Sequence, residues 1–228
     1  MRNKLVLVAA LLTIALLRLH IFQIGGQREE GIGPRPAPLP LEKVSIGEYV
    51  RMVRERYNIT IYLPSALPRG YVLTAAYVAV NPQNKTLVDP RFGVIVYSAV
   101  GNEDPITAEL VIGIYVLRVP PNYEELKETY KERGISLRPL TVESLKWEYG
   151  NETDRMIIME VNGWPVRINK HAAISYPARK EKYGDWTHMA EVWIWDGKSP
   201  FYVNYCIDAP ELTIKELVEV IRSMKPIT

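Results

Sequence analysis

Few side chains in this 228-residue sequence could bind a metal ion. Beyond the first forty residues, the best nitrogen and sulfur ligands are His171, His188 and Cys206, and the pattern Asp185-x-x-His188-x-x-Glu191 adds two carboxylates. A spacing of three residues suits one face of a helix, but this region alternates like a strand, where an odd spacing sends side chains to opposite faces. We therefore predict ordinary polar residues of strands and loops here, and no metal site.

The candidates for nucleophilic or acid–base catalysis are equally weak. Cys206 lies in an apolar stretch, Tyr-Val-Asn-Tyr-Cys-Ile, which predicts a buried and unreactive thiol. There is no G-x-S-x-G motif, and Gly31-Ile-Gly33 precedes prolines rather than a helix, unlike a phosphate-binding loop. The carboxylate pairs Glu103-Asp104 and Glu124-Glu125 fall in a turn and at a helix start, where acidic residues serve structure. The sequence predicts no catalytic residue and no cofactor, and it favours a protein that is not an enzyme.

The aromatic residues near the C-terminus are the remaining candidates. Trp193 and Trp195 share one face of their strand by its two-residue period, and the facing strand carries Phe201, Val203 and Tyr205. Trp193, Trp195 and Tyr205 could form a platform for a lipid or a sugar. They could equally lie in the core beneath the last helix, and the dominance of aromatic residues in cores favours that interpretation. If there is a ligand, we expect a hydrophobic one held between sheet and helix.

The first 26 residues predict a membrane anchor or a signal segment. Residues 5–24 are almost wholly apolar and are long enough, as a helix, to cross a bilayer, with Arg18 in the outer third. Arg2 and Lys4 precede this segment, so the positive-inside rule predicts a cytoplasmic N-terminus and an extracellular domain. A cleaved signal is the alternative, because the uninterrupted apolar core of residues 5–17 has signal-peptide length. The sequence lacks a clean small-x-small cleavage site, because cutting after Gly26 would leave Ile24 at the minus-three position, and this favours a retained single-pass anchor over a secreted protein.

Composition limits the partners that the exported part can have. The net charge of +2 includes Arg2, Lys4 and Arg18, so the remainder carries 25 basic and 26 acidic residues. This balance removes the general argument for nucleic-acid binding. The single cysteine excludes an internal disulfide, so packing must hold the fold.

Three sequons agree with export, namely those at Asn58, Asn84 and Asn151, which are possible glycosylation sites. Few glutamines, many charged and β-branched residues and abundant loop prolines are typical of thermophiles. Together with the sequons, this composition predicts a hyperthermophilic archaeal source.

The organisation that we predict is an anchor or signal segment at 1–26, a proline-rich tether at 27–41 and one domain at 42–228. The tether has PRPAPLP-type spacing, which favours an extended spacer. In the domain, Ser45 caps a first helix that ends at Asn58, Asn122 caps an inserted helix, and Thr213 caps the last one. Strands are expected at 59–63, 71–80, 94–100, 108–119, 145–149, 155–161, 166–168, 189–195 and 201–207, with loops at 81–93 and 178–186. Hairpin connections dominate, so the fold class is α+β with a curved antiparallel sheet.

Several of these segments resemble a known family. These segments are Leu67-Pro-Arg-Gly-Tyr71, Val161-Asn-Gly163, Val192-Trp-Ile-Trp-Asp-Gly197, Phe201-Tyr-Val203, Leu212-Thr, Glu216-Leu-Val and Ile221-Arg-Ser-Met224. They resemble an uncharacterised extracytoplasmic domain of bacterial and archaeal envelope proteins, some of them anti-sigma-factor-like, which is similar to lipoprotein-carrier folds. The resemblance implies a curved antiparallel sheet with a helix against it and supplies no catalytic residues.

We therefore expect a membrane-tethered, extracytoplasmic binding or interaction domain without catalysis, whose partner is an envelope protein or a hydrophobic ligand. The alternatives are a cell-surface hydrolase, which would need a convergent polar cluster, and a structural envelope component.

Overall fold

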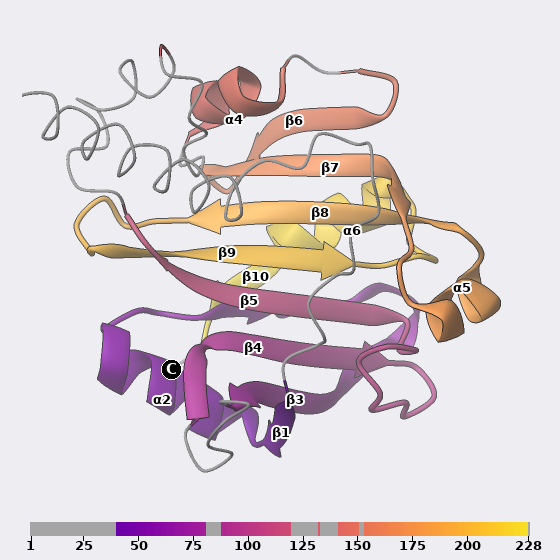
Figure 1. Cartoon of the computed structure of the whole chain (residues 1–228), viewed down its shortest axis with the longest axis horizontal. Coiled ribbons are helices and arrows are strands. Elements are labelled where there is room, and N and C mark those ends of the chain that lie inside the picture. Colours follow the sequence, from indigo (N-terminus) through magenta and orange to yellow (C-terminus); the bar gives the residue numbers. More distant parts are fainter. Residues whose placement is uncertain (1–39, 81–87, 120–131, 133–140, 151–152, 228) are drawn as a thin grey trace, which may run out of the picture. The chain divides into compact units, whose positions relative to one another are not determined.

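The computed structural model describes residues 40–80, 88–119, 132, 141–150 and 153–227. Among these residues, eight strands form one sheet in the order β1-β3-β4-β5-β9-β8-β7-β6, with every neighbouring pair antiparallel (Figure 1). The strands are β1 (Leu41–Val44), β3 (Val72–Val80), β4 (Val88–Ser98), β5 (Leu110–Arg118), β6 (Met156–Val161), β7 (Trp164–Ala173), β8 (Trp186–Ile194) and β9 (Phe201–Asp208). A second, two-stranded sheet pairs β2 (Tyr62–Pro64) with β10 (Met224–Pro226).

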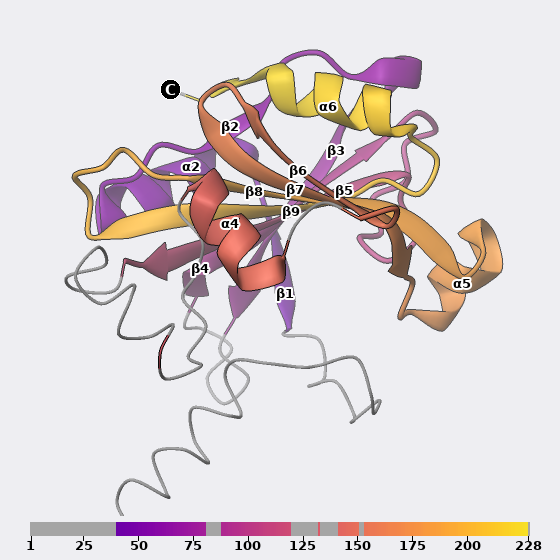
Figure 2. The same ribbon diagram turned by 90° about the horizontal axis from the view of Figure 1, so that it is seen from above.

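Helices lie on both sides of the large sheet. The described helices are α2 (Ile46–Tyr57), α4 (Val142–Tyr149), α5 (Pro177–Tyr183) and α6 (Ile214–Arg222), with a short 3₁₀ helix, η1 (Pro68–Gly70). Figure 2 shows α6 and α4 on opposite sides of the sheet, and α5 lies beyond one end of the strands. We call the side that α2 and α6 cover the covered face.

Alternate residues of the strands build the core on the covered face. Buried side chains there include Ile95, Ile112, Ile114, Val192, Val203 and Ile207. Leu217, Val218, Val220 and Ile221 of α6 belong to the same cluster and are also buried. Core side chains therefore fill the space between α6 and the sheet, where the sequence had suggested a hydrophobic ligand.

Helix α2 follows its sequence signals. The backbone N–H of Glu48 donates to Oγ of the N-cap Ser45 at 3.1 Å, and Asn58 ends the helix in the left-handed region with φ of 53°. The helix packs on β4 through Tyr49, which is buried over Gly93. A Cβ atom at Gly93 would lie 2.4 Å from Cζ of Tyr49, so the close approach of α2 to β4 requires glycine at this position.

The α+β class with an antiparallel sheet is confirmed, as are the first and last helices and the Asn162-Gly163 hairpin between β6 and β7. The strand predicted at 145–149 is wrong, because these residues belong to helix α4. Its N-cap Thr141 and Ser144 form a reciprocal capping box that starts the helix before the aromatic residues.

Other boundaries also differ. The loop predicted at 178–186 contains α5, whose first residue is a proline, a favourable position for starting a helix. The loop predicted at 81–93 is shorter, because β4 begins at Val88. Strand β1 includes Leu41, which the sequence assigned to the tether.

Two predicted segments fall where the structure gives no description. The inserted helix at 123–133 lies outside the described residues except for Glu132, and the membrane segment at 5–24 lies outside them entirely. Among the helices that are described, none has the length and apolar character to cross a bilayer.

We predict that Gly93→Ala lowers the free energy of unfolding by about 2 kcal/mol, because the added methyl group collides with the buried ring of Tyr49. Chemical denaturation followed by circular dichroism measures the change. Gly47→Ala is the matched control, because a Cβ atom at Gly47 meets no atom within 4 Å and alanine favours the helix. A Gly93→Ala protein as stable as the wild type would contradict the packing of α2 on β4.

Helix α6 begins with a capping box that also fastens it to η1. The Thr213 N–H donates to Oε2 of Glu216 at 2.8 Å, and Arg69 donates from Nε and Nη2 to the two carboxylate oxygens at 3.1 Å each. The Arg69 guanidinium is the larger cause and the Thr213 hydrogen bonds the next, and together they hold the pKa of Glu216 at about 2. Because this pKa lies below its ordinary value, the charged carboxylate stabilises the fold above the ordinary pKa, and this stabilisation is lost as the pH falls toward 2.

We predict that Glu216→Gln lowers the melting temperature at pH 7 and that the difference from the wild type shrinks as the pH falls from about 4.5 to 2. Calorimetry across this pH range provides the measurement. Glu219→Gln is the control on the same helix, since Glu219 makes an exposed ion pair with Arg222. A difference between Glu216→Gln and wild type that is the same at pH 2 and pH 7 would refute the role of the charge.

Candidate binding surface

The structure does not bring the three residues of the predicted aromatic platform together. Strands β8 and β9 pair Trp193 with Asn204 and Val192 with Tyr205, so Trp193 and Tyr205 point to opposite faces of the sheet. Trp193 is 3% exposed and Tyr205 is fully buried. Trp195 is 36% exposed, but it lies beyond the end of β8, where its indole N–H donates to the Ser199 carbonyl at 2.8 Å. Trp193 and Tyr205 are therefore core residues, which is the interpretation that the sequence favoured, and Trp195 lies in the turn after β8.

Tyr205 has a structural role in the core. Its hydroxyl oxygen accepts a hydrogen bond from the backbone N–H of Tyr62 at 2.8 Å, which ties the small β2–β10 sheet to the centre of the large one. Burial raises the pKa of Tyr205 well above its ordinary value, so the hydroxyl stays protonated. This supports the interpretation of Tyr205 as core.

The candidate metal ligands are also kept apart. Nδ1 of His188 lies 2.6 Å from the Leu212 carbonyl, whereas Glu191 accepts from Nε of Arg167 at 2.8 Å on the other face of β8. His188 and Glu191 thus lie on opposite faces, as the alternation of a strand predicts. Within the described part of the chain, no group of three His, Cys, Asp or Glu side chains is placed to hold a metal ion.

Cys206 is partly buried on the same face as Glu191, with which it is paired across β8 and β9. Burial is the main cause that raises the pKa of this thiol to about 12, with smaller contributions from the nearby charges of Glu191 and Asp208. The thiol is therefore protonated at neutral pH and is a poor nucleophile.

The prominent exposed aromatic group lies at the start of β8. Trp186 is 51% exposed, although a tryptophan is among the side chains that gain most from burial. Its ring stacks on the exposed imidazole of His171 with centroids 4.3 Å apart and planes 18° apart. Tyr176, 43% exposed, occupies the N-cap position of α5, in the connection between the two strands, but its side chain makes no capping hydrogen bond. We call His171, Tyr176 and Trp186 the aromatic ledge.

Local geometry explains why these residues are displayed. Ala173 pairs with Trp186, and the register of β7 shifts between Asn169 and Ala172, next to His171. Such an irregularity bends a strand and re-aims its side chains. The sequence predicts Trp186 at the end of a charged loop and therefore indicates no role for the ledge. The predicted strand began at Met189, and extending it by three residues toward the N-terminus would have included Trp186.

Helix α5, which carries the connection beside the ledge, is held by one buried arginine. The side chain of Arg179 is 3% exposed, with Nε 3.0 Å from Oδ2 of Asp208. Its Nη1 donates to the carbonyl oxygens of Ile106 and Ala108 at 3.1 and 2.7 Å. The guanidinium also lies over the ring of Tyr183, 5.1 Å from its centroid. These contacts fix α5 against the start of β5.

Two further side chains of α5 bind the segment just before β5. Nζ of Lys182 and the hydroxyl of Tyr183 both donate to the Thr107 carbonyl at 2.9 Å. The hydrogen bond from Lys182 to Tyr183 is the largest cause that raises the pKa of Lys182, which is thereby kept charged. The polar groups of α5 thus serve docking, and the described residues around them show no separate catalytic arrangement.

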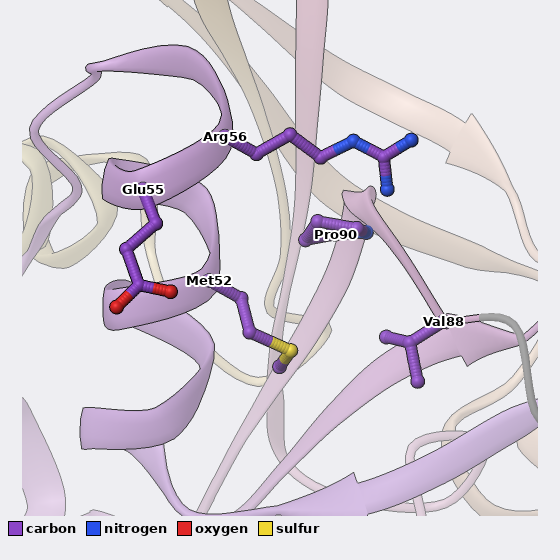
Figure 3. A pocket seen from close by; sticks show the side chains of 5 residues that line it. All are labelled: Met52, Glu55, Arg56, Val88 and Pro90. Carbon is purple, nitrogen blue, oxygen red and sulfur yellow. The ribbon is translucent and has the colours of Figure 1, made fainter.

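A second surface feature is an open hollow between α2 and β4, with a volume of about 300 Å³ (Figure 3). It is lined by Met52, Glu55, Arg56, Val88 and Pro90. In Figure 3 the Arg56 side chain extends past Pro90 and Met52 turns toward β4, while Glu55 points away from them. The hollow is shallow and its polar groups do not converge, so it is a weak candidate for a ligand site.

Comparison with known proteins adds no relative. No family model matches the chain, and no curated protein or solved structure matches it significantly. The resemblance to envelope domains stays a prediction. The fold and the ledge define an α+β domain with an exposed aromatic surface at one end of its sheet.

The sequons lie in different surroundings. Asn58 and Thr60 are exposed after α2. Asn84 and Asn151 lie outside the described residues. Glycosylation at all three positions stays a prediction.

We predict that Arg179→Met lowers the free energy of unfolding by about 3 kcal/mol, because it leaves buried carbonyl groups and Asp208 without their cation. Limited proteolysis should cut the 174–185 connection faster than in the wild type, and thermal denaturation should report the loss of stability. Lys180→Met on the next residue is the control, because its ion pair with Asp185 is exposed and removing it should change stability by less than about 0.5 kcal/mol. Equal stability of the two variants would contradict the anchoring role of Arg179.

Proposed function

We propose that this protein is a membrane-tethered, extracytoplasmic binding domain of the cell envelope that recognises an envelope protein and catalyses no reaction itself. Residues 5–24 serve as a single-pass anchor with the N-terminus in the cytoplasm, and residues 27–41 serve as the spacer. The apolar segment and the basic residues before it support this orientation. The near balance of charges outside the anchor disfavours nucleic acid as the partner.

The observation that carries the proposal is the exposure of Trp186 in a fixed orientation. A half-exposed tryptophan stacked on histidine offers a rigid apolar surface with little conformational entropy to lose on binding. Tryptophan and tyrosine are enriched among the residues that dominate binding energy in protein interfaces. The packed interior beneath α6 supports a surface partner over a ligand held inside the domain.

A photo-reactive residue at Tyr176, within the ledge, tests this function. We expect the full chain carrying benzoylphenylalanine at Tyr176 to form one discrete adduct with an envelope protein when irradiated in intact cells. Trp186→Ala in this background should reduce the adduct by about tenfold or more, as expected for a dominant interface residue.

Trp195→Ala is the matched control, because Trp195 is also partly exposed but lies past the other end of β8. It should leave the adduct unchanged. An adduct that survives Trp186→Ala, or the absence of any discrete adduct, would count against the ledge as the binding surface. A cross-link to a small apolar molecule instead of a protein would show that the partner is not an envelope protein.

A further inference from the structure

The two edges of the large sheet are protected very differently. At one edge, β1 has four residues, including Glu42 and Lys43, and follows Pro40. The other edge is β6 (Figure 1). It has six residues and a single charged side chain, Glu160, among methionine, isoleucine and valine. Natural proteins protect edge strands by making them short or by adding charges and prolines, since an open edge invites another strand. By this criterion β1 is protected, whereas in the part of the chain that the structure describes β6 has no proline and one charge, and its neighbour on the other face is α4, which packs against β6 and β7.

Open backbone groups on β6 can be located from its register with β7. Val161 and Trp164 flank the two-residue turn, so they form a hydrogen-bonded pair. Because such pairs alternate along an antiparallel ladder, Ile158 and Glu160 direct their N–H and C=O groups away from β7. Pro165, which has no N–H to give, stands opposite Glu160 as this pattern requires.

The outward groups of the first residue of β6 are already used. The N–H of Met156 donates to the Thr153 carbonyl at 3.2 Å, and the Met156 carbonyl accepts from the Thr153 N–H at 3.0 Å. Among the described residues, the open part of the edge is therefore short and defined, with two donors and two acceptors on Ile158 and Glu160.

We propose that β6 pairs antiparallel with β6 of a second copy of this chain, about a two-fold axis that passes through Met159. In this register Ile158 stands opposite Glu160 of the second copy, and Glu160 stands opposite Ile158 of the second copy. All four open groups of each chain are then satisfied by four hydrogen bonds between the chains. A symmetric, isologous contact of this kind is the commonest arrangement of soluble homo-oligomers.

The side chains of β6 fit their own copy in this register. On the covered face, Met159 meets Met159 of the second copy, and Ile157 meets Val161 of the second copy. Ile157 and Met159 are half-buried side chains packed against the core cluster, so pairing removes their remaining apolar surface from water. On the other face the single charged residue, Glu160, stands opposite the uncharged Ile158. The side chains of β6 are therefore complementary to those of β6 in a second copy of the chain.

Cysteine cross-linking of the full chain in detergent micelles tests both the contact and its register. Facing residues at Met159 are about 4.5 Å apart between Cα atoms, within disulfide range. Met159→Cys should therefore form a disulfide-linked dimer when a mild oxidant takes up the two electrons and two protons of the thiols. Ile157→Cys is the matched control, because the two copies of residue 157 lie about 13 Å apart in this register. The wild type, whose only thiol is Cys206, gives the background.

A proline on the edge provides the second arm. In the Met159→Cys background, Glu160→Pro removes one outward donor from each chain without removing a bond to β7, and it should reduce the dimer by about tenfold. Glu160→Gln keeps the donor and should retain the dimer. Light scattering of the wild type and of Glu160→Pro alone gives the same comparison without an added cysteine.

Three results would overturn the proposal: a folded Met159→Cys chain that stays monomeric, equal cross-linking of Ile157→Cys, or a dimer that Glu160→Pro leaves intact.

Discussion

One constraint governs this structure: the covered face of an eight-stranded sheet must be kept from water, and the described elements that cover it come from both ends of the domain. Helix α2 precedes the long strands, whereas α6 follows them, and both contribute to a single buried cluster with Ile112, Val192 and Val203. The pairing of β2 with β10 joins the two ends directly. Because no disulfide is possible with one cysteine, this shared burial is the dominant stabilising term.

Specific polar contacts set how the covering elements lie on the sheet. The side-chain amide of Asn162, in the turn between β6 and β7, donates to the carbonyl oxygens of Ile221 and Arg222 at 3.3 and 3.2 Å. It thereby satisfies carbonyl groups that the end of α6 leaves without helical partners. At the other end of the strands, Arg179 fixes the position of α5 by donating to the carbonyl oxygens of Ile106 and Ala108, just before β5. Apolar burial thus decides that these elements pack, and a few directional bonds decide where.

The sequence predicted what depends on local periodicity and failed where distant segments had to be placed. Ser45, Asn58 and Thr213 marked helix ends correctly because capping is a local interaction. The residues of α4 were predicted as a strand because Trp147 and Tyr149 favour strands, while the cap at Thr141 lay further upstream. Trp193 and Tyr205 were placed on one face because alternation fixes faces within a strand, whereas the register between two strands sets which faces coincide. The aromatic ledge was missed because the start of β8 and the exposure of Trp186 depend on tertiary structure.

The pairing of β5 with β9 has a consequence for the time course of folding. These central strands join residues 83 to 97 positions apart, from Arg118 with Phe201 to Val111 with Asp208. Closing so long a loop costs entropy before any contact repays it, so a topology of this kind folds slowly. During synthesis from the N-terminus, β5 has no partner on this side until almost the whole chain has emerged. The nascent chain must therefore stay unfolded, with an apolar strand exposed, for most of its synthesis, which leaves it open to aggregation.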